Sequence, residues 1–121
     1  MPTSFDDDAV PTVQFDPRLE ISPFLVFRRL RDGAPLALVD VRSQPEGSTL
    51  RGADRWSDAW RPPTDRQVVL FDDDGSLAVP LAERYQGEGH AHVKALFGGL
   101  QLWRFSLDPE VVGEDTFLEE V

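Results

Sequence analysis

The sequence contains no cysteine among its 121 residues. That absence excludes disulfide bonds, thiolate metal sites and every reaction that uses a cysteine nucleophile. No persulfide can form on this chain, because a persulfide requires a cysteine sulfur.

Basic residues are also scarce, since 12 lysines and arginines face 22 aspartates and glutamates and give a net charge of −10. Such a surface repels phosphate backbones and anionic lipid headgroups, so we expect neither a nucleic acid nor a membrane as partner. No apolar stretch reaches membrane-spanning length, and residues 1–10 carry Asp6, Asp7 and Asp8 where a secretory signal would be basic and then apolar. A cytoplasmic protein is the resulting expectation.

The length suits one domain with a single core. We expect a flexible acidic tail over 1–12, a globular domain over 13–106 and an acidic extension over 107–121. For that extension the sequence leaves open a solvated helix over one sheet face and a contact with a partner.

Short apolar runs alternate with helical patterns along the middle of the chain. Ser22-Pro23 is typical of a helix start, and Asp32-Gly33 of its end. Buried strands are expected at 36–41, 67–71 and 92–96, further helices at 78–86 and from Gly98-Gly99 through Trp103, and a short edge strand at 13–15. Residues 44–65 have the composition of a loop with at most one short helix. The alternation predicts an α/β fold with a parallel sheet.

Four motifs occur in an order that resembles the rhodanese family. Ile21-Ser22-Pro23 is similar to the opening of its first helix, and the segment from Leu38 to Arg42, followed by Glu46, resembles its Asp-Val-Arg strand. The segment Leu50-Arg51-Gly52-Ala53 is a partial match, and Val93 to Trp103 resembles the closing strand, Gly-Gly turn and tryptophan helix. The family motif residues are therefore Asp40, Arg42, Glu46, Gly52, Gly98, Gly99 and Trp103. The resemblance implies a three-layer fold whose central parallel sheet has about five strands flanked by helices. We expect Arg42 to pair with Asp40 or Glu46.

The resemblance also places a degenerate active-site loop after the strand at 67–71. In active members this loop begins with the catalytic cysteine and usually ends with arginine or another basic or polar residue, whereas here it comprises Asp72, Asp73, Asp74, Gly75, Ser76 and Leu77. A carboxylate cannot perform the sulfur exchange of a thiolate. We hypothesise that Asp72 itself occupies the backbone N–H groups of the loop, because such amide nests favour an anion.

The same segment resembles the first motif of haloacid dehalogenase-like phosphatases. In that alternative Asp72 attacks phosphorus, Asp74 protonates the leaving group, and Lys94 is the fixed cation beside Mg²⁺, with Glu114 and Asp115 completing the metal site. That family places the motif near the chain start with a longer core behind it, whereas only about fifty residues follow here. A plain turn is the favoured explanation of Asp-Asp-Gly, because Asp tolerates turn geometry and Gly supplies positive φ.

No other pattern indicates a catalytic residue, a metal site or a cofactor. His90 and His92 lack further metal ligands nearby in sequence, so we expect His90 to pack under the sheet edge and His92 to face solvent. Trp56 and Trp60 either cap the core or form an aromatic patch for a partner. The sequence therefore predicts a non-catalytic binding or regulatory module, with a protein partner or self-association left open.

Overall fold

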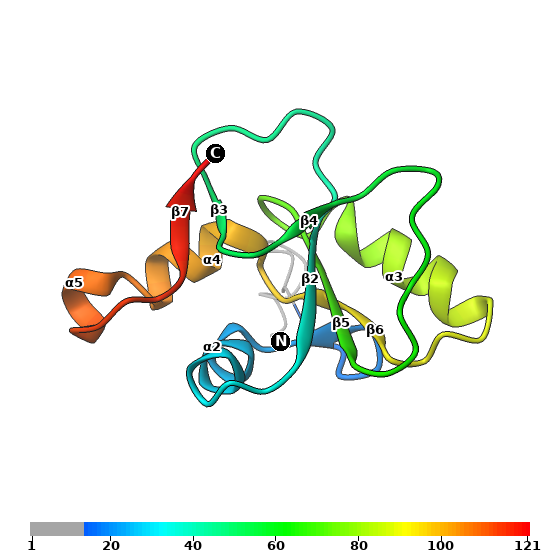
Figure 1. Ribbon diagram of the computed structural model, residues 1–121, viewed down its shortest axis with the longest axis horizontal. Helices are drawn as coiled ribbons and strands as arrows, with labels where there is room; N and C mark the ends of the chain where they lie inside the picture. Colours follow the sequence, from blue (N-terminus) through cyan, green and yellow to red (C-terminus); the bar gives the residue numbers. More distant parts are fainter. Residues whose placement is uncertain (1–13) are drawn as a thin grey trace, which may run out of the picture.

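A computed structural model describes residues 14–121 (Figure 1). The expected tail at 1–12 and Val13 lie outside these residues. In chain order the elements are β1 (Glu20–Ile21), α2 (Pro23–Arg31), β2 (Leu36–Asp40), β3 (Ser48–Leu50), β4 (Asp54–Arg55), β5 (Gln67–Phe71), α3 (Ala78–Gly87), β6 (Val93–Leu96), α4 (Gly99–Ser106), α5 (Pro109–Val112) and β7 (Leu118–Glu120).

The central sheet has five strands in the order β1-β6-β5-β2-β4, and every neighbouring pair is parallel. The longest pairing joins β2 to β5 in register from Leu36 opposite Gln67 to Asp40 opposite Phe71. These two strands therefore end at the same edge of the sheet. The expected α/β fold with a five-stranded parallel sheet flanked by helices is confirmed.

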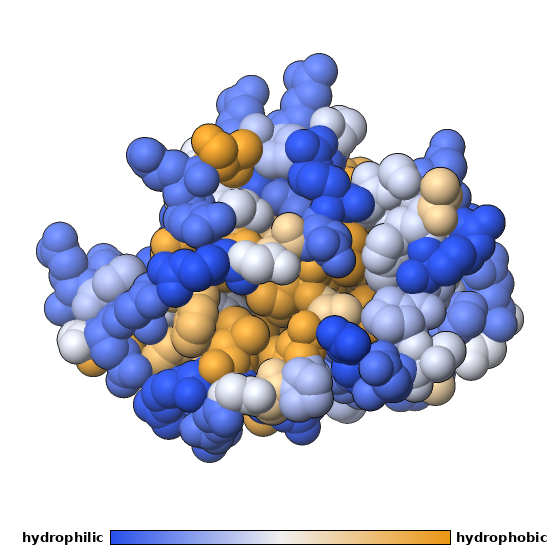
Figure 2. Space-filling model, viewed as in Figure 1, coloured by the Kyte–Doolittle hydropathy of each residue, from blue (hydrophilic) through white to orange (hydrophobic). Residues whose placement is uncertain are grey.

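Helices cover the sheet on both faces, with α3 on one side and α2 and α4 on the other (Figure 1). Alternation along β5 divides the core: Val69 and Phe71 pack in the cluster that includes α2 and α4, whereas Val68 and Leu70 pack against α3. This period of two is the geometry of a strand buried on both faces. Figure 2 shows apolar side chains in a hollow near α2 and β2, ringed by hydrophilic ones.

Helix α2 begins where the sequence predicts. The Ser22 side chain accepts a hydrogen bond from the N–H of Phe24 at 3.2 Å, and Pro23 occupies the first helical turn, where its missing N–H costs nothing. The buried residues Val26 and Phe27 direct the helix onto the sheet.

Three sequence expectations are corrected. The edge strand is Glu20–Ile21 and not 13–15, since Gln14 and Phe15 have no strand structure. Residues 44–65 contain the short strands β3 and β4 and no helix. The acidic segment 107–121 contains one turn of helix, α5, and the strand β7, which pairs antiparallel with β3. Strands of two or three residues leave too little local pattern to predict, and the partners β3 and β7 are also about seventy residues apart in the chain.

Among residues 14–121, no helix has the length and apolar character needed to cross a membrane.

Candidate functional site

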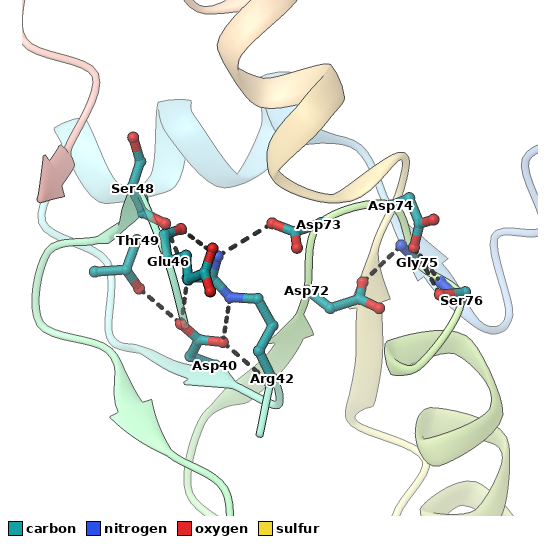
Figure 3. A network of polar contacts seen from close by, with 10 residues as sticks. All are labelled: Asp40, Arg42, Glu46, Ser48, Thr49, Asp72, Asp73, Asp74, Gly75 and Ser76. Atoms are coloured by element: carbon teal, nitrogen blue, oxygen red, sulfur yellow. Dashed lines mark hydrogen bonds and ion pairs between the residues drawn. The ribbon is translucent and has the colours of Figure 1, made fainter. Parts of the chain in front are cut away.

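The loop after β5 is organised around a buried carboxylate at Asp72, which is only 2 % exposed. Its Oδ1 accepts a hydrogen bond from the N–H of Gly75 at 2.6 Å, as Figure 3 shows, and its Oδ2 accepts one from the N–H of Leu77 at 2.7 Å. Both oxygens of Asp72 are thus engaged by amides of its own loop. Gly75 has a φ of +96°, a conformation that glycine adopts without steric cost.

The next two aspartates are exposed and have different partners. Asp74 Oδ1 accepts the N–H of Ser76 at 2.9 Å and its hydroxyl at 2.7 Å, and these bonds lower the pKa of the Asp74 carboxyl below its ordinary value. Asp73 accepts a hydrogen bond from Arg42 Nη1 at 3.1 Å. Three consecutive identical residues therefore have three different structural roles.

The start of α4 packs directly on this loop. The N–H groups of Leu100 and Gln101 donate to the carbonyls of Asp72 and Asp73 at 2.9 and 2.8 Å. Gly99, with a φ of +63°, sits so close that a Cβ there would lie 2.6 Å from the carbonyl carbon and oxygen of Asp73. Gly98 also has positive φ, at +73°. The Gly-Gly pair thus permits the close approach of helix and loop.

A buried guanidinium, Arg42, connects the end of β2 to its surroundings (Figure 3). Its Nε and Nη2 donate to the two oxygens of Asp40 at 3.0 and 2.7 Å. Further bonds go to the backbone carbonyls of Glu46 at 3.0 Å and Ser48 at 2.8 Å, besides the bond to Asp73. The sequence offered Asp40 or Glu46 as partner: Asp40 is the ion pair, and Glu46 contributes its carbonyl oxygen instead of its carboxylate.

The Asp40 and Arg42 charges stabilise each other. Burial raises the pKa of Asp40, but hydrogen bonds from the Arg42 side chain and backbone outweigh burial, so the net pKa is lowered. Thr49 adds a hydroxyl bond to Asp40 at 3.0 Å. The hydrogen bond to Asp40 raises the pKa of Arg42 against the opposing effect of burial. No sequence pattern predicts the contact of Arg42 with Asp73, because Asp73 follows a different strand.

The remaining motif residues lie away from the loop or in the core. Gly52 has a φ of +82° in the turn between β3 and β4. Trp103 is fully buried, and its Nε1 donates to the carbonyl of Thr116 at 3.0 Å. That bond fastens the segment between α5 and β7 to α4.

The two loop tryptophans pack against α3. Trp56 Nε1 donates to the hydroxyl of Tyr85 at 3.0 Å, and the Trp60 ring meets the Tyr85 ring edge-on at 5.3 Å. Both are partly buried against the α3-side core. The His90 ring packs edge-on against the Tyr85 ring at 6.2 Å. His92 does not face solvent as expected: it is half-buried, with Nε2 2.6 Å from the carbonyl oxygen of Pro63.

The phosphatase interpretation gains no support from this arrangement. Lys94 donates to the carbonyl of Pro17 at 2.5 Å, Glu114 pairs with Arg31 and Asp115 pairs with Arg51. Within the part of the chain that the structure describes, no three His, Asp or Glu side chains are placed to bind a metal ion together.

Solved structures of other proteins have a similar fold. No family model and no curated protein matches the sequence. A rhodanese-related protein from Thermoplasma volcanium superimposes with a TM-score of 0.59 at 13 % identity, over 73 % of this chain and 92 % of that one. A full-length protein from Lactobacillus plantarum gives 0.61 at 16 % identity, over 85 % and 88 %.

A thiosulfate sulfurtransferase from Pseudomonas aeruginosa is similar over 73 % of this chain but only 19 % of its own length, with 25 % identity and a TM-score of 0.57. The fold is therefore that of a rhodanese-like α/β domain, defined by the parallel sheet and its helices. This particular chain has the rhodanese-like fold without any cysteine.

Proposed function

We propose that this chain is a cytoplasmic rhodanese-like domain without sulfurtransferase activity, and that it acts as a binding or regulatory module. The observation that carries the proposal is the loop after β5. In it the Asp72 carboxylate accepts the N–H groups of Gly75 and Leu77, in a chain that has no cysteine.

Sulfur transfer requires a nucleophile that attacks a sulfur atom, retains it and releases it to an acceptor. A thiolate performs the attack because sulfur is polarisable, and it allows the release because it is also a good leaving group. The Asp72 carboxylate supplies neither property. Its negative charge on the loop amides also opposes entry of an anion such as thiosulfate, since the two anions would compete for the same donors.

Support for a binding role comes from what the loop exposes. The carboxylate of Asp73 is 55 % exposed, and Leu77, at the position where active members usually have arginine, is 55 % exposed. An apolar groove of about 340 Å³ begins at Leu77 and continues along α3 past Leu81 and Arg84, with Trp56 on its other wall. Surfaces that combine exposed apolar and charged groups are typical of interaction sites.

The test of inactivity is a thiosulfate and cyanide assay that measures thiocyanate. We expect the purified chain to give the rate of its own heat-denatured sample. The Pseudomonas aeruginosa thiosulfate sulfurtransferase serves as the positive control. Thiocyanate formation above the heat-denatured rate, proportional to the amount of chain added, would refute the proposal.

A further inference from the structure

Two adjoining apolar grooves share Phe97 and Leu102, and one of them reaches the degenerate loop at Asp74. One has a volume of about 520 Å³ and the other about 310 Å³. Together they form a trough, here called the phenylalanine groove, that extends along α4 to the start of α2. Its lining includes Phe15, Phe24, Phe97, Leu102, Phe105 and, at the loop end, Asp74.

Three of these aromatic rings are unusually exposed. Phe105 is 85 % exposed, Phe24 is 53 % exposed and Phe15 is 45 % exposed. Phe15 meets Phe97 edge-on at 5.3 Å, so the rings belong to one continuous surface. Single exposed apolar residues are ordinary, but several large ones along one trough are characteristic of a surface that another molecule covers.

Charge determines which molecule fits. Asp74 is the one charged residue among those lining the phenylalanine groove in the described part of the chain. Both of its hydrogen bonds from Ser76 go to Oδ1, so Oδ2 retains its capacity to accept. The carboxylate of Asp73, the preceding residue, is already paired with Arg42 and adds little charge, but the whole chain carries −10. The local and the overall charge both favour a cationic partner.

Two other occupants have the wrong charge. A second copy of this chain would bring another −10 to the contact, and residues 1–13 would bring Asp6, Asp7 and Asp8 towards Asp74. Like charges brought together at an interface oppose association.

We infer that the phenylalanine groove binds a basic amphipathic helix of another protein. The apolar face of that helix packs on Phe105, Leu102 and Phe24, and a lysine or arginine beside that face pairs with Asp74. Helices commonly bind apolar grooves in this way, through residues spaced three and four apart. The inference names a partner class for the binding role proposed above and rests on that role.

The experiment uses the full chain and two synthetic helices of about four turns. One has leucine and phenylalanine at helical spacing with lysine between them, and the other has glutamate in place of every lysine. We expect saturable binding of the lysine helix by fluorescence anisotropy, weakened about tenfold by Phe105→Ser and about threefold by Asp74→Asn.

Matched controls come from α5, where Val111 is 80 % exposed and Glu110 is also exposed but neither lines the groove. Val111→Ser and Glu110→Gln should leave the affinity unchanged. Equal weakening by control and groove variants, or equal affinity for the glutamate helix, would overturn the inference. So would a dimer in sedimentation that Phe105→Ser dissociates, or a tenfold gain in helix affinity on deleting residues 2–13.

The two proposals fail separately. Thiocyanate production would refute the inactive-site proposal whatever the helix does. Absence of helix binding in a chain that makes no thiocyanate would refute the groove assignment alone.

Discussion

At the scale of single residues, the carboxylate of Asp72 occupies the backbone amides of the loop after β5 and gives them a negative partner. Asp72 is buried and satisfies two amides at 2.6 and 2.7 Å, so it is both the acceptor for those donors and the negative charge among them. Asp73 and Asp74, next in sequence, remain exposed and bond to Arg42 and Ser76. Residue type alone therefore does not assign the roles of the three aspartates.

Replacing Asp72 by asparagine should destabilise the fold by about 1–3 kcal/mol, because the amide NH₂ cannot accept a bond and leaves one buried N–H unpaired. The measurement is urea unfolding at neutral pH. Asp58→Asn, at an exposed loop position, is the control and should change the free energy of unfolding little. Equal stability of the two variants would show that the Asp72 bonds contribute nothing to folding.

The ion pair between Asp40 and Arg42 predicts a dependence of stability on pH. The pKa of Asp40 is lower in the folded chain than its ordinary value, because Arg42 bonds outweigh the burial that raises it. The contribution is therefore fully present above the unfolded pKa of about 3.9 and is lost as pH falls through the lower folded pKa. Both side chains of this ion pair are buried: Arg42 is 6 % exposed and Asp40 is 3 % exposed.

Asp40→Asn should cost about 3 kcal/mol at neutral pH, because it removes the buried counter-charge of Arg42 and leaves only the exposed carboxylate of Asp73. The difference in free energy of unfolding from the unsubstituted chain should begin to narrow below about pH 4, because Asp40 of the unfolded chain then takes up a proton, and it should disappear only below the lower pKa of the folded Asp40. Urea unfolding of both chains at neutral pH and near pH 3 measures this difference in free energy. Asp65→Asn, which removes an exposed pair with Arg66, is the control and should have little effect at either pH. A difference that stays constant with pH would contradict the assignment.

At the scale of elements, the contact between α4 and the loop depends on the absence of a side chain at Gly99. Gly99→Ala should destabilise the domain by about 2–4 kcal/mol, from the left-handed φ and from a Cβ only 2.6 Å from the Asp73 backbone. Gly113→Ala is the matched control: its φ is +86°, and a Cβ there would meet nothing within 4 Å. Only the conformational cost of about 1–2 kcal/mol should remain there. Thermal or urea unfolding of both variants compares them, and equal losses would exclude the close packing as the cause.

The helices and strands also differ in how well the sequence predicts them. Buried runs such as Leu36–Asp40 and Gln67–Phe71 and the cap at Ser22 give strong local signals, and these strands and this helix are where the sequence placed them. The strands β3, β4 and β7 have two or three residues each. The positions of such short strands depend on their pairing partners and not on their own composition. The composition of these segments therefore predicted a loop or a helix instead of a strand.

At the scale of the whole molecule, the fold and the chemistry follow different rules. Rhodanese-like neighbours share at most a quarter of their residues with this chain in the matches given above, yet the parallel sheet and its helices superimpose. Two apolar clusters, one on each face of the sheet, preserve that architecture. Such a core tolerates many apolar exchanges as long as volume and patterning persist. A fold conserved in this way does not carry an activity with it.

By itself the sequence determined that no thiol chemistry is available, that the charge is strongly negative, and that buried strands alternate with helices, because composition and periodicity are properties of the chain alone. The sequence also led to the hypothesis that Asp72 occupies the amides of its own loop. Only the tertiary structure decided that Arg42 reaches Asp73 and that Phe105 and Phe24 both line the phenylalanine groove. Those contacts depend on where the elements lie in three dimensions, and packing of the whole core sets that arrangement.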